Sequence, residues 1–124
     1  MFIKKLKIFS LFILLLNPNL LNALNDFTNP KEMEELYKTN ELEVLFYFNG
    51  LGAGIRVGQL IADKNDKRFC IPDDKGFSAL EYYEIYRYEY LSNKTYYDNE
   101  IERGDYTPAS IMMFLGFTSL YPCN

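Results

Sequence analysis

The chain has 124 residues, a net charge of −4 at neutral pH, two cysteines and no histidine. Its length allows one domain with one modest hydrophobic core. The acidic balance argues against nucleic acid as a partner, because nucleic acids select basic surfaces.

Residues 1–23 have the features of a secretory signal peptide. Three lysines give a positive start, an apolar run from 8 to 16 follows, and Ala23 offers a small residue for cleavage. This apolar run is shorter than a membrane span requires, so we expect cleavage rather than anchoring.

Cleavage would leave residues 24–124 as a single exported domain. Without the three leader lysines, this domain carries ten basic groups against 17 acidic ones, a net charge of −7. Such a charge suits a basic protein partner and also favours solubility. Export implies an oxidising compartment, so Cys70 and Cys123 are expected to form a disulfide rather than to remain reactive thiols.

The first two predicted helices have clear start signals. Asn29 is expected to cap a short helix that ends near Thr39, with Pro30 at its first position. Asn40 is expected to cap the next helix, which runs from Glu41 to about Ala62. We expect this long apolar helix to be central, with the rest of the chain wrapped around it.

Gly50, Gly54 and Gly58 recur every four residues in the long helix and form one ridge without side chains. Each glycine costs a helix about 1 kcal/mol relative to alanine, so three on one face require a packing partner. The pattern predicts that another helix packs closely against this ridge in a soluble core.

Two other functions of the glycine-rich run are not expected. It lacks the Gly-Lys-Ser/Thr ending of a phosphate-binding loop and the strand that precedes a dinucleotide fingerprint. Stable membrane insertion is also not expected, because polar side chains interrupt the run at Asn49, Arg56 and Gln59.

A third helix is predicted from Ala79 to about Ser92. Ser78 and Glu81 have the spacing of a capping box, and Phe77 and Tyr82 that of a hydrophobic staple. Five tyrosines follow, at 82, 83, 86, 88 and 90, which is more than one core-facing stripe holds. The rings either cover a small core or form a protein contact, where tyrosine is enriched.

The segment from Asn93 to Tyr106 is polar and without clear periodicity, which predicts a long irregular loop. The last helix is expected to start with Thr107 as N-cap and Pro108 at its first position. Its apolar run from Ile111 to Leu120 is expected to be buried. With weak strand signals, the fold class is all-α, a small domain of about four helices.

The residues available for catalysis are few. The four serines of the mature chain have no histidine to activate them, and the two cysteines are expected to be paired. We therefore expect no enzyme, no cofactor and no metal site. A binding or inhibitory protein is the default interpretation.

Several landmarks follow one another along the chain: Tyr47-x-x-Gly50-x-x-x-Gly54, Phe69-Cys70-Ile71-Pro72, Tyr90-Leu91, Thr107-Pro108-Ala109 and Tyr121-Pro122-Cys123. In this order they resemble the Rap/Tai family of periplasmic immunity proteins, which protect bacteria from peptidoglycan amidases delivered by type VI secretion. The resemblance covers about Leu36 to Cys123. It implies a small helical, often dimeric protein that plugs the active-site cleft of a cell-wall amidase.

The sequence departs from the family pattern in two places. Members often have a further cysteine pair, but Phe48 occupies one of its positions and the upstream partner is missing, which supports pairing between Cys70 and Cys123. The polar loop before Thr107 is longer than expected. We take it as the candidate inhibitory contact, with the residues Tyr96, Tyr97, Asp98, Glu100, Glu102, Arg103 and Asp105.

Alternatives to this interpretation stay open. The polar loop is otherwise a solvated connector, in which case the tyrosine-rich helix is the next candidate contact. The protein is otherwise a small helical periplasmic acid-stress chaperone, which would release apolar surface at low pH, or an envelope-binding protein. A neighbouring gene for a secreted amidase would favour the immunity function.

Overall fold

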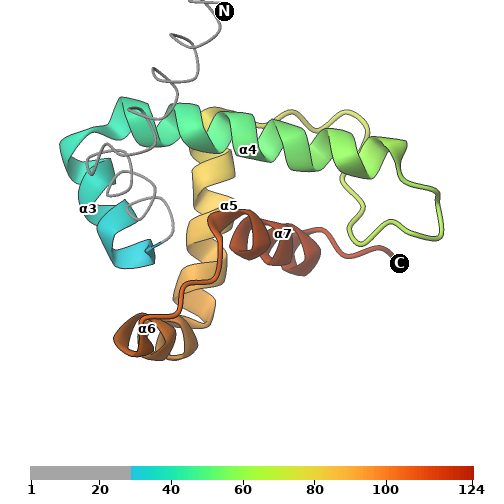
Figure 1. Ribbon diagram of the computed structural model, residues 1–124. Coiled ribbons are helices and arrows are strands. Elements are labelled where there is room, and N and C mark those ends of the chain that lie inside the picture. Colours follow the sequence, from blue (N-terminus) through green and yellow to red (C-terminus); the bar gives the residue numbers. More distant parts are fainter. Residues whose placement is uncertain (1–28) are drawn as a thin grey trace, which may run out of the picture.

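A computed structural model describes residues 29–124 of the chain, so the signal peptide expected at 1–23 lies outside the described residues. The described part is all-α, as predicted, and contains no strand. It has five helices rather than about four (Figure 1): α3 (Pro30–Thr39), α4 (Glu41–Ile61), α5 (Ala79–Ser92), α6 (Lys94–Arg103) and α7 (Ala109–Leu120).

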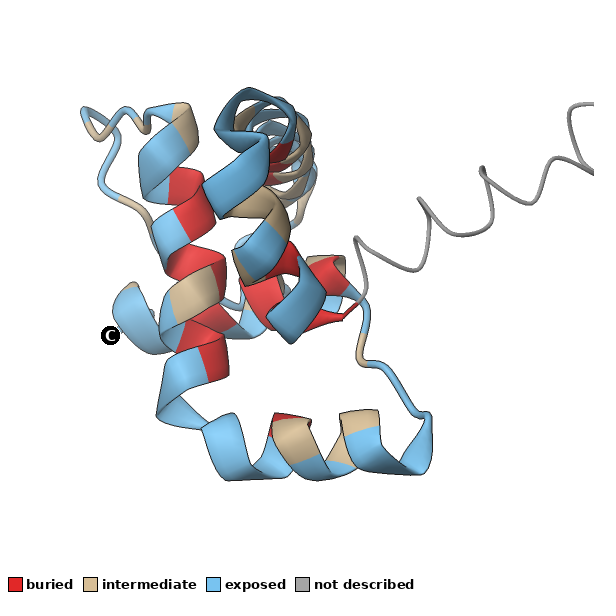
Figure 2. Ribbon diagram, turned by 90° about the vertical axis from the view of Figure 1, so that its left-hand side faces the viewer, coloured by how far each residue is buried: buried red, intermediate tan, exposed pale blue. Residues whose placement is uncertain are grey.

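Helix α5, not α4, is the central element. Helices α4, α6 and α7 all pack against α5, and Figure 2 shows buried residues concentrated along it. Six of its 14 residues are buried, whereas α4 buries three of 21. The expectation that the rest of the chain wraps around α4 is therefore wrong: α4 offers only one side to the core.

Four of the five tyrosines of α5 belong to the core. Tyr82, Tyr83, Tyr86 and Tyr90 are each at most 5% exposed, and only Tyr88 reaches the surface, at 43%. The ring of Phe48 in α4 lies 4.7 Å from that of Tyr86, centroid to centroid. The core takes up more tyrosine rings than one core-facing stripe would hold, because α5 has helices on more than one side.

The start signals of α3 and α5 act as predicted. The Asn29 side chain accepts a hydrogen bond from the Lys31 backbone N–H at 3.0 Å. The Ser78 hydroxyl accepts from the Glu81 N–H at 3.1 Å, and the Glu81 carboxylate accepts from the Ser78 N–H at 2.7 Å. This capping box fixes the first turn of the central helix.

The other two start signals act differently. Asn40 stands at the cap position of α4, but its side chain donates to Glu43 at 2.6 Å and makes no capping hydrogen bond. Pro108, rather than Thr107, is the residue before the first helical position of α7. The Thr107 hydroxyl donates to Glu100 at 2.6 Å instead, so it joins α7 to α6.

Cys70 and Cys123 form the predicted disulfide. It joins the connection between α4 and α5 to the C-terminal end of the chain. Close by, the Cys70 N–H donates to the Tyr121 carbonyl at 2.8 Å, and the ring of Phe69 stacks on Phe117 at 4.9 Å. These contacts hold an otherwise irregular connection against α7.

Helix α7 is only partly buried, contrary to the expectation for its apolar run. Met112, Met113 and Phe117 have no exposed surface, whereas Ile111 is 49% and Leu115 39% exposed. The reason is that α7 packs on α5 with one face, and no described element covers the other.

Candidate partner-binding surfaces

The glycine ridge does not pack against another helix of the described chain. Apart from the backbone of α4 itself, no described atom lies within 4 Å of the position that a Cβ would take at Gly50, Gly54 or Gly58. The prediction of close packing in a soluble core is thus wrong for these three glycines. They lie on sides of α4 that no other described helix reaches.

Close packing occurs at two other glycines, which the four-residue glycine pattern did not indicate. A Cβ at Gly52 would lie 2.2 Å from the ring of Tyr82, and one at Gly116 would lie 2.5 Å from the backbone oxygen of Ile85. Gly52 follows Val44 and Phe48 at intervals of four residues. That spacing places it on the core-facing side of α4 and is the signal that could have identified it.

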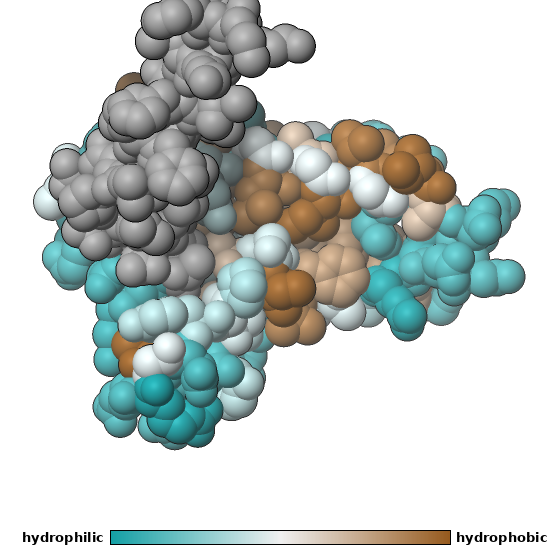
Figure 3. Space-filling view, in the orientation of Figure 1, coloured by the Kyte–Doolittle hydropathy of each residue, from teal (hydrophilic) through white to brown (hydrophobic). Residues whose placement is uncertain are grey.

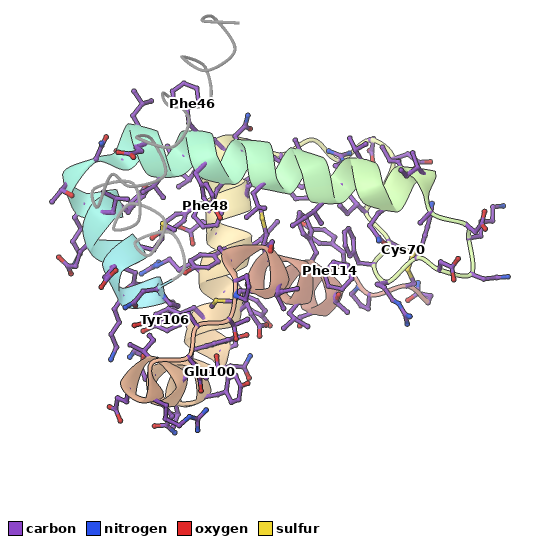
Figure 4. All side chains as sticks on the ribbon, viewed as in Figure 1. Phe46, Phe48, Cys70, Glu100, Tyr106 and Phe114 are labelled. Atoms are coloured by element: carbon purple, nitrogen blue, oxygen red, sulfur yellow. A yellow bond between two sulfur atoms is a disulfide. The ribbon has the colours of Figure 1, made fainter. Side chains whose placement is uncertain are left out.

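Opposite the core, α4 carries an apolar surface, which we call the outer face of α4. It comprises Leu42, Phe46, Gly50, Ala53, Gly54, Val57, Leu60 and Ile61, all of them exposed. Leu42 and Phe46, two large apolar side chains of this face, are 66% and 70% exposed. Figure 4 shows Phe46 pointing away from the other helices and Phe48 pointing toward them, and Figure 3 shows apolar surface toward the C-terminal end of α4.

Among the described residues, α4 is the one helix long and apolar enough to cross a membrane, judged by length and composition alone. Only 17% of its apolar window is buried, unlike the core helix of a soluble protein. Its inner side nevertheless packs against α5 and α3. Helix α4 therefore carries more apolar side chains than the core of the described residues buries.

The segment predicted as an irregular loop, 93–106, is mostly the helix α6. It ends at Gly104, whose φ of 77° lies in the left-handed region that glycine adopts readily. The helix lacks an apolar stripe, so its periodicity was not visible. Polar pairs one turn apart support it instead: Lys94 with Asp98, and the Tyr96 hydroxyl with Glu100 at 2.8 Å.

Three of the predicted contact residues hold α6 in place. Tyr97 is 3% exposed, and its hydroxyl donates to the buried carboxylate of Glu89 at 2.7 Å. Asp98 accepts from the Tyr90 hydroxyl at 2.8 Å, and Glu100 accepts from Thr107. These side chains serve the fold, which makes them poor candidates for a partner contact.

These hydrogen bonds also favour the charged carboxylates. The Lys94 ammonium, with help from the Tyr90 hydroxyl, lowers the pKa of Asp98 below its ordinary value. The Thr107 hydroxyl does the same for the pKa of Glu100. Both groups therefore remain ionised at neutral pH and attach α6 to its neighbours.

The other predicted contact residues face solvent. Tyr96 is 57% exposed, and Glu102, Arg103 and Asp105 are also exposed. Arg103 and Asp105 make one long surface ion pair, at 3.8 Å. We call these four residues the outer surface of α6. It presents one aromatic ring, two carboxylates and one guanidinium to a partner.

A hollow of about 370 Å³ lies between the end of α4 and the segment around the disulfide. Its lining includes Arg56, Lys67 and Cys70, and it is open to solvent. The Arg56 guanidinium donates to the Lys75 carbonyl, so one of its donors is already engaged. The lining offers no arrangement of groups that is specific to one ligand.

Residues 29–124 hold no group of three or more cysteine, aspartate or glutamate side chains that could bind a metal ion. No protein family, no curated protein and no solved structure matches this chain.

Proposed function

We propose that this chain is an exported immunity protein that binds a secreted peptidoglycan amidase and occludes its active site without turnover. One observation carries the proposal. The segments Phe69-Cys70-Ile71-Pro72 and Tyr121-Pro122-Cys123, on which the resemblance to the Rap/Tai family most depends, meet in a disulfide. The resemblance is thus built on residues that also organise the fold, and the extracytoplasmic location that it implies suits a disulfide.

The outer surface of α6 is our candidate for the inhibitory contact. Helix α6 packs chiefly on α5, and Figure 2 shows it apart from the other helices, at one end of the molecule. Its exposed carboxylates, Glu102 and Asp105, suit a basic rim around an amidase cleft, because charge complementarity steers association. Tyr96 adds a ring of the kind that anchors protein interfaces.

The proposal expects a gene for a secreted amidase beside this one, and the test is protection of bacteria in which that amidase is exported to the periplasm. We expect the full-length chain to protect and to co-purify with the amidase. Glu102→Lys with Asp105→Lys should weaken protection at least tenfold in toxin dose, because two attractive charges become repulsive. Asp98 and Glu100 are left intact, since they hold α6 in place.

The control variant is Asp73→Lys with Asp74→Lys, which reverses two exposed carboxylates on a distant turn. It should protect like the unchanged protein. Full protection by the α6 variant would move the contact elsewhere, to the exposed parts of α5 first. Failure of the unchanged chain to bind or protect against the amidase would overturn the proposed function itself.

A second function, a periplasmic acid-stress chaperone or an envelope-binding protein, is favoured by one observation. The outer face of α4 exposes large apolar side chains, such as Ile61 at 82%. A chaperone would bind unfolded clients through such a surface. Suppression of client aggregation at acid pH, lost in a Phe46→Glu variant, would support this function over immunity.

A further inference from the structure

Three large apolar side chains are exposed together at the C-terminal end of α4. Val57, Leu60 and Ile61 are 56%, 68% and 82% exposed, and Ile61 is the most exposed of the large hydrophobic side chains in the part of the chain that the structure describes. Apolar side chains that gather at a surface in this way mark an interaction site. Burial of these three side chains against a partner would be favourable.

The same end of the molecule is the one basic region of an acidic chain. From 44 to 72 the sequence has four basic and two acidic residues. Acidic residues outnumber basic ones on either side, by five to two from 29 to 43 and by nine to four from 73 to 124. The charged residues of the basic region are Arg56, Lys64, Lys67 and Arg68 with Asp63 and Asp66. A positive patch on a negatively charged protein selects an anionic partner.

The basic and the apolar groups lie side by side. Arg56, Leu60 and Lys67 line one hollow, and Lys64 follows Ile61 by three positions in the sequence. Figure 3 shows the apolar end of α4 next to the hydrophilic surface of the turn that follows it. Apolar side chains bordered by lysine and arginine are typical of segments that lie in the interface of a membrane containing anionic lipids.

We propose that the C-terminal end of α4 and the turn after it, residues 57–68, dock on the surface of an anionic lipid bilayer. The three apolar side chains enter the headgroup region, and the basic side chains of the turn contact the lipid phosphates. This inference names the ligand of the second function, envelope binding, and rests on that function rather than on amidase inhibition.

Helix α4 lies on the bilayer and does not cross it. To cross, α4 would have to leave α5, which would expose the packed ring of Phe48 and break the close contact between Gly52 and Tyr82. Docking leaves these contacts unchanged. Glu41 and Glu43 lie in the first turn of α4 and are repelled by anionic lipid. The helix is therefore tilted, with its C-terminal end nearer to the lipid.

An acidic protein would also match the positive patch, but the composition of α4 favours lipid. In length and apolar content α4 is comparable to a membrane-spanning helix, and only 17% of its apolar window is buried. Such a surface gains more from an apolar environment than from a charged protein surface.

The first experiment measures sedimentation of protein expressed from the full sequence with vesicles of phosphatidylglycerol and phosphatidylethanolamine. We expect binding that falls at high salt and nearly vanishes on phosphatidylcholine vesicles, because both conditions remove the attraction between charges. Lys64→Gln with Lys67→Gln should weaken binding about 25-fold, since each basic residue near an anionic surface contributes about fivefold. Ile61→Glu should abolish binding, because it places a carboxylate at the apolar contact.

Two control variants change the same kinds of residue elsewhere. Lys38→Gln with Arg103→Gln removes two exposed positive charges from α3 and α6, and Leu91→Glu changes a side chain of α5 that is 46% exposed. Both controls should bind vesicles like the unchanged protein. The inference is overturned if the unchanged protein binds neither kind of vesicle or both equally, if Ile61→Glu binds normally, or if the charge control loses as much as the variant of the turn.

The second experiment measures orientation with an environment-sensitive dye on Ile61→Cys or on Leu42→Cys, quenched by brominated lipid. We expect strong quenching at 61 and weak quenching at 42, at the glutamate end of α4. Equal or stronger quenching at 42 overturns the tilted docking.

Other occupants of this surface give different results. Protein that ignores vesicles but binds polyglutamate would assign the patch to an acidic protein, and protein that ignores vesicles but has twice the mass of one chain in light scattering would assign it to a second copy. Either result overturns the inference. Protection against the amidase is measured separately, so failure of vesicle binding and failure of the immunity function are distinguishable.

Discussion

Gly52 and Gly58 lie in the same helix but in opposite environments. A Cβ at Gly52 would meet the ring of Tyr82 at 2.2 Å, whereas one at Gly58 would have no described atom within 4 Å beyond the backbone of its own helix. We predict that Gly52→Ala lowers the free energy of unfolding by about 1–3 kcal/mol through overpacking. Gly58→Ala should raise it by about 1 kcal/mol, because alanine favours the helix.

Thermal melts of the two variants measure these changes. Gly58 is exposed, so its variant reports helix propensity without a change in packing among the described residues. Effects of the same sign in both variants would contradict the environments that the structure gives them.

The carboxylate of Glu81 links the start of α5 to the preceding turn. The Lys75 ammonium, at 2.8 Å, and the Ser78 N–H lower its pKa to about 2. A carboxylate whose pKa is lower in the folded state than in the unfolded state stabilises the fold at pH values above the pKa of the unfolded state. This stabilisation is lost as the pH falls toward the folded pKa.

We therefore predict a smaller loss of unfolding free energy between about pH 5 and pH 2 in Glu81→Gln than in the unchanged protein. Urea denaturation at several pH values measures it, with the exposed Glu102→Gln as the matched control. An identical acid profile in Glu81→Gln and the unchanged protein would show that the pair with Lys75 adds no pH-dependent stability.

At the scale of elements, helix ends proved readable from the sequence where capping residues define them. The helix predicted from Ala79 to about Ser92 has these bounds in the structure, and the predicted end of α4 differs by one residue. Capping is local chemistry, so it is visible in a few residues. The pairing of the two cysteines was also predictable, because only one intramolecular pair exists.

The way in which the helices pack against one another could not be predicted from the sequence as the helix ends could. Three glycines four residues apart suggested a buried ridge on α4, but the helix buries Gly52 instead. Helix α6 was missed because its support comes partly from distant groups, such as Glu89 beneath Tyr97. The spacing of Val44, Phe48 and Gly52 marks the core-facing side of α4, but apolar residues also cover its other sides, so the sequence alone did not single this side out.

Glu89 gives a direct test of how α6 is attached. This carboxylate, 6% exposed, accepts hydrogen bonds from the Tyr97 hydroxyl at 2.7 Å and from the Asn93 side chain at 3.1 Å. We predict that Glu89→Ala costs about 1–3 kcal/mol, because the buried Tyr97 hydroxyl loses its acceptor. Hydrogen exchange should accelerate in α6 more than in α7.

The matched control is Glu84→Ala, which removes an exposed carboxylate from the same helix. Its exchange in α6 should equal that of the unchanged protein. If Glu89→Ala left the protection of α6 intact, the attachment would rest on Asp98 and Glu100 alone.

At the scale of the whole molecule, an aromatic core centred on α5 is bounded by α4 and α7, each of which leaves one side uncovered by other described elements. The connection from 62 to 78 contains no regular helix or strand and closes the end of the core beside α7. Phe69, 2% exposed, is its main apolar anchor, and the next residue carries the disulfide. The covalent link therefore fastens a connection that has no regular helix or strand of its own.

We predict that Cys70→Ser with Cys123→Ser lowers the free energy of unfolding by about 4 kcal/mol in the chain-entropy description, because the bridge closes a long loop. The two cysteines are separated by 53 positions in the sequence. The loss arises mainly in the unfolded state, so the fold should survive at low temperature with the helix content of the unchanged protein. Urea denaturation and circular dichroism measure the two quantities.

The unchanged protein, denatured with and without reductant, is the matched control, since reduction opens the same loop without altering a residue. The serine variant and the reduced unchanged protein should lose similar amounts of unfolding free energy relative to the oxidised unchanged protein. A far smaller loss of unfolding free energy in the serine variant would contradict the chain-entropy description. The connection would then be held mainly by the stacking of Phe69 on Phe117 and by the hydrogen bond from Cys70 to Tyr121. A variant without helix content would show that the bridge is required to form the core, and not only to stabilise it.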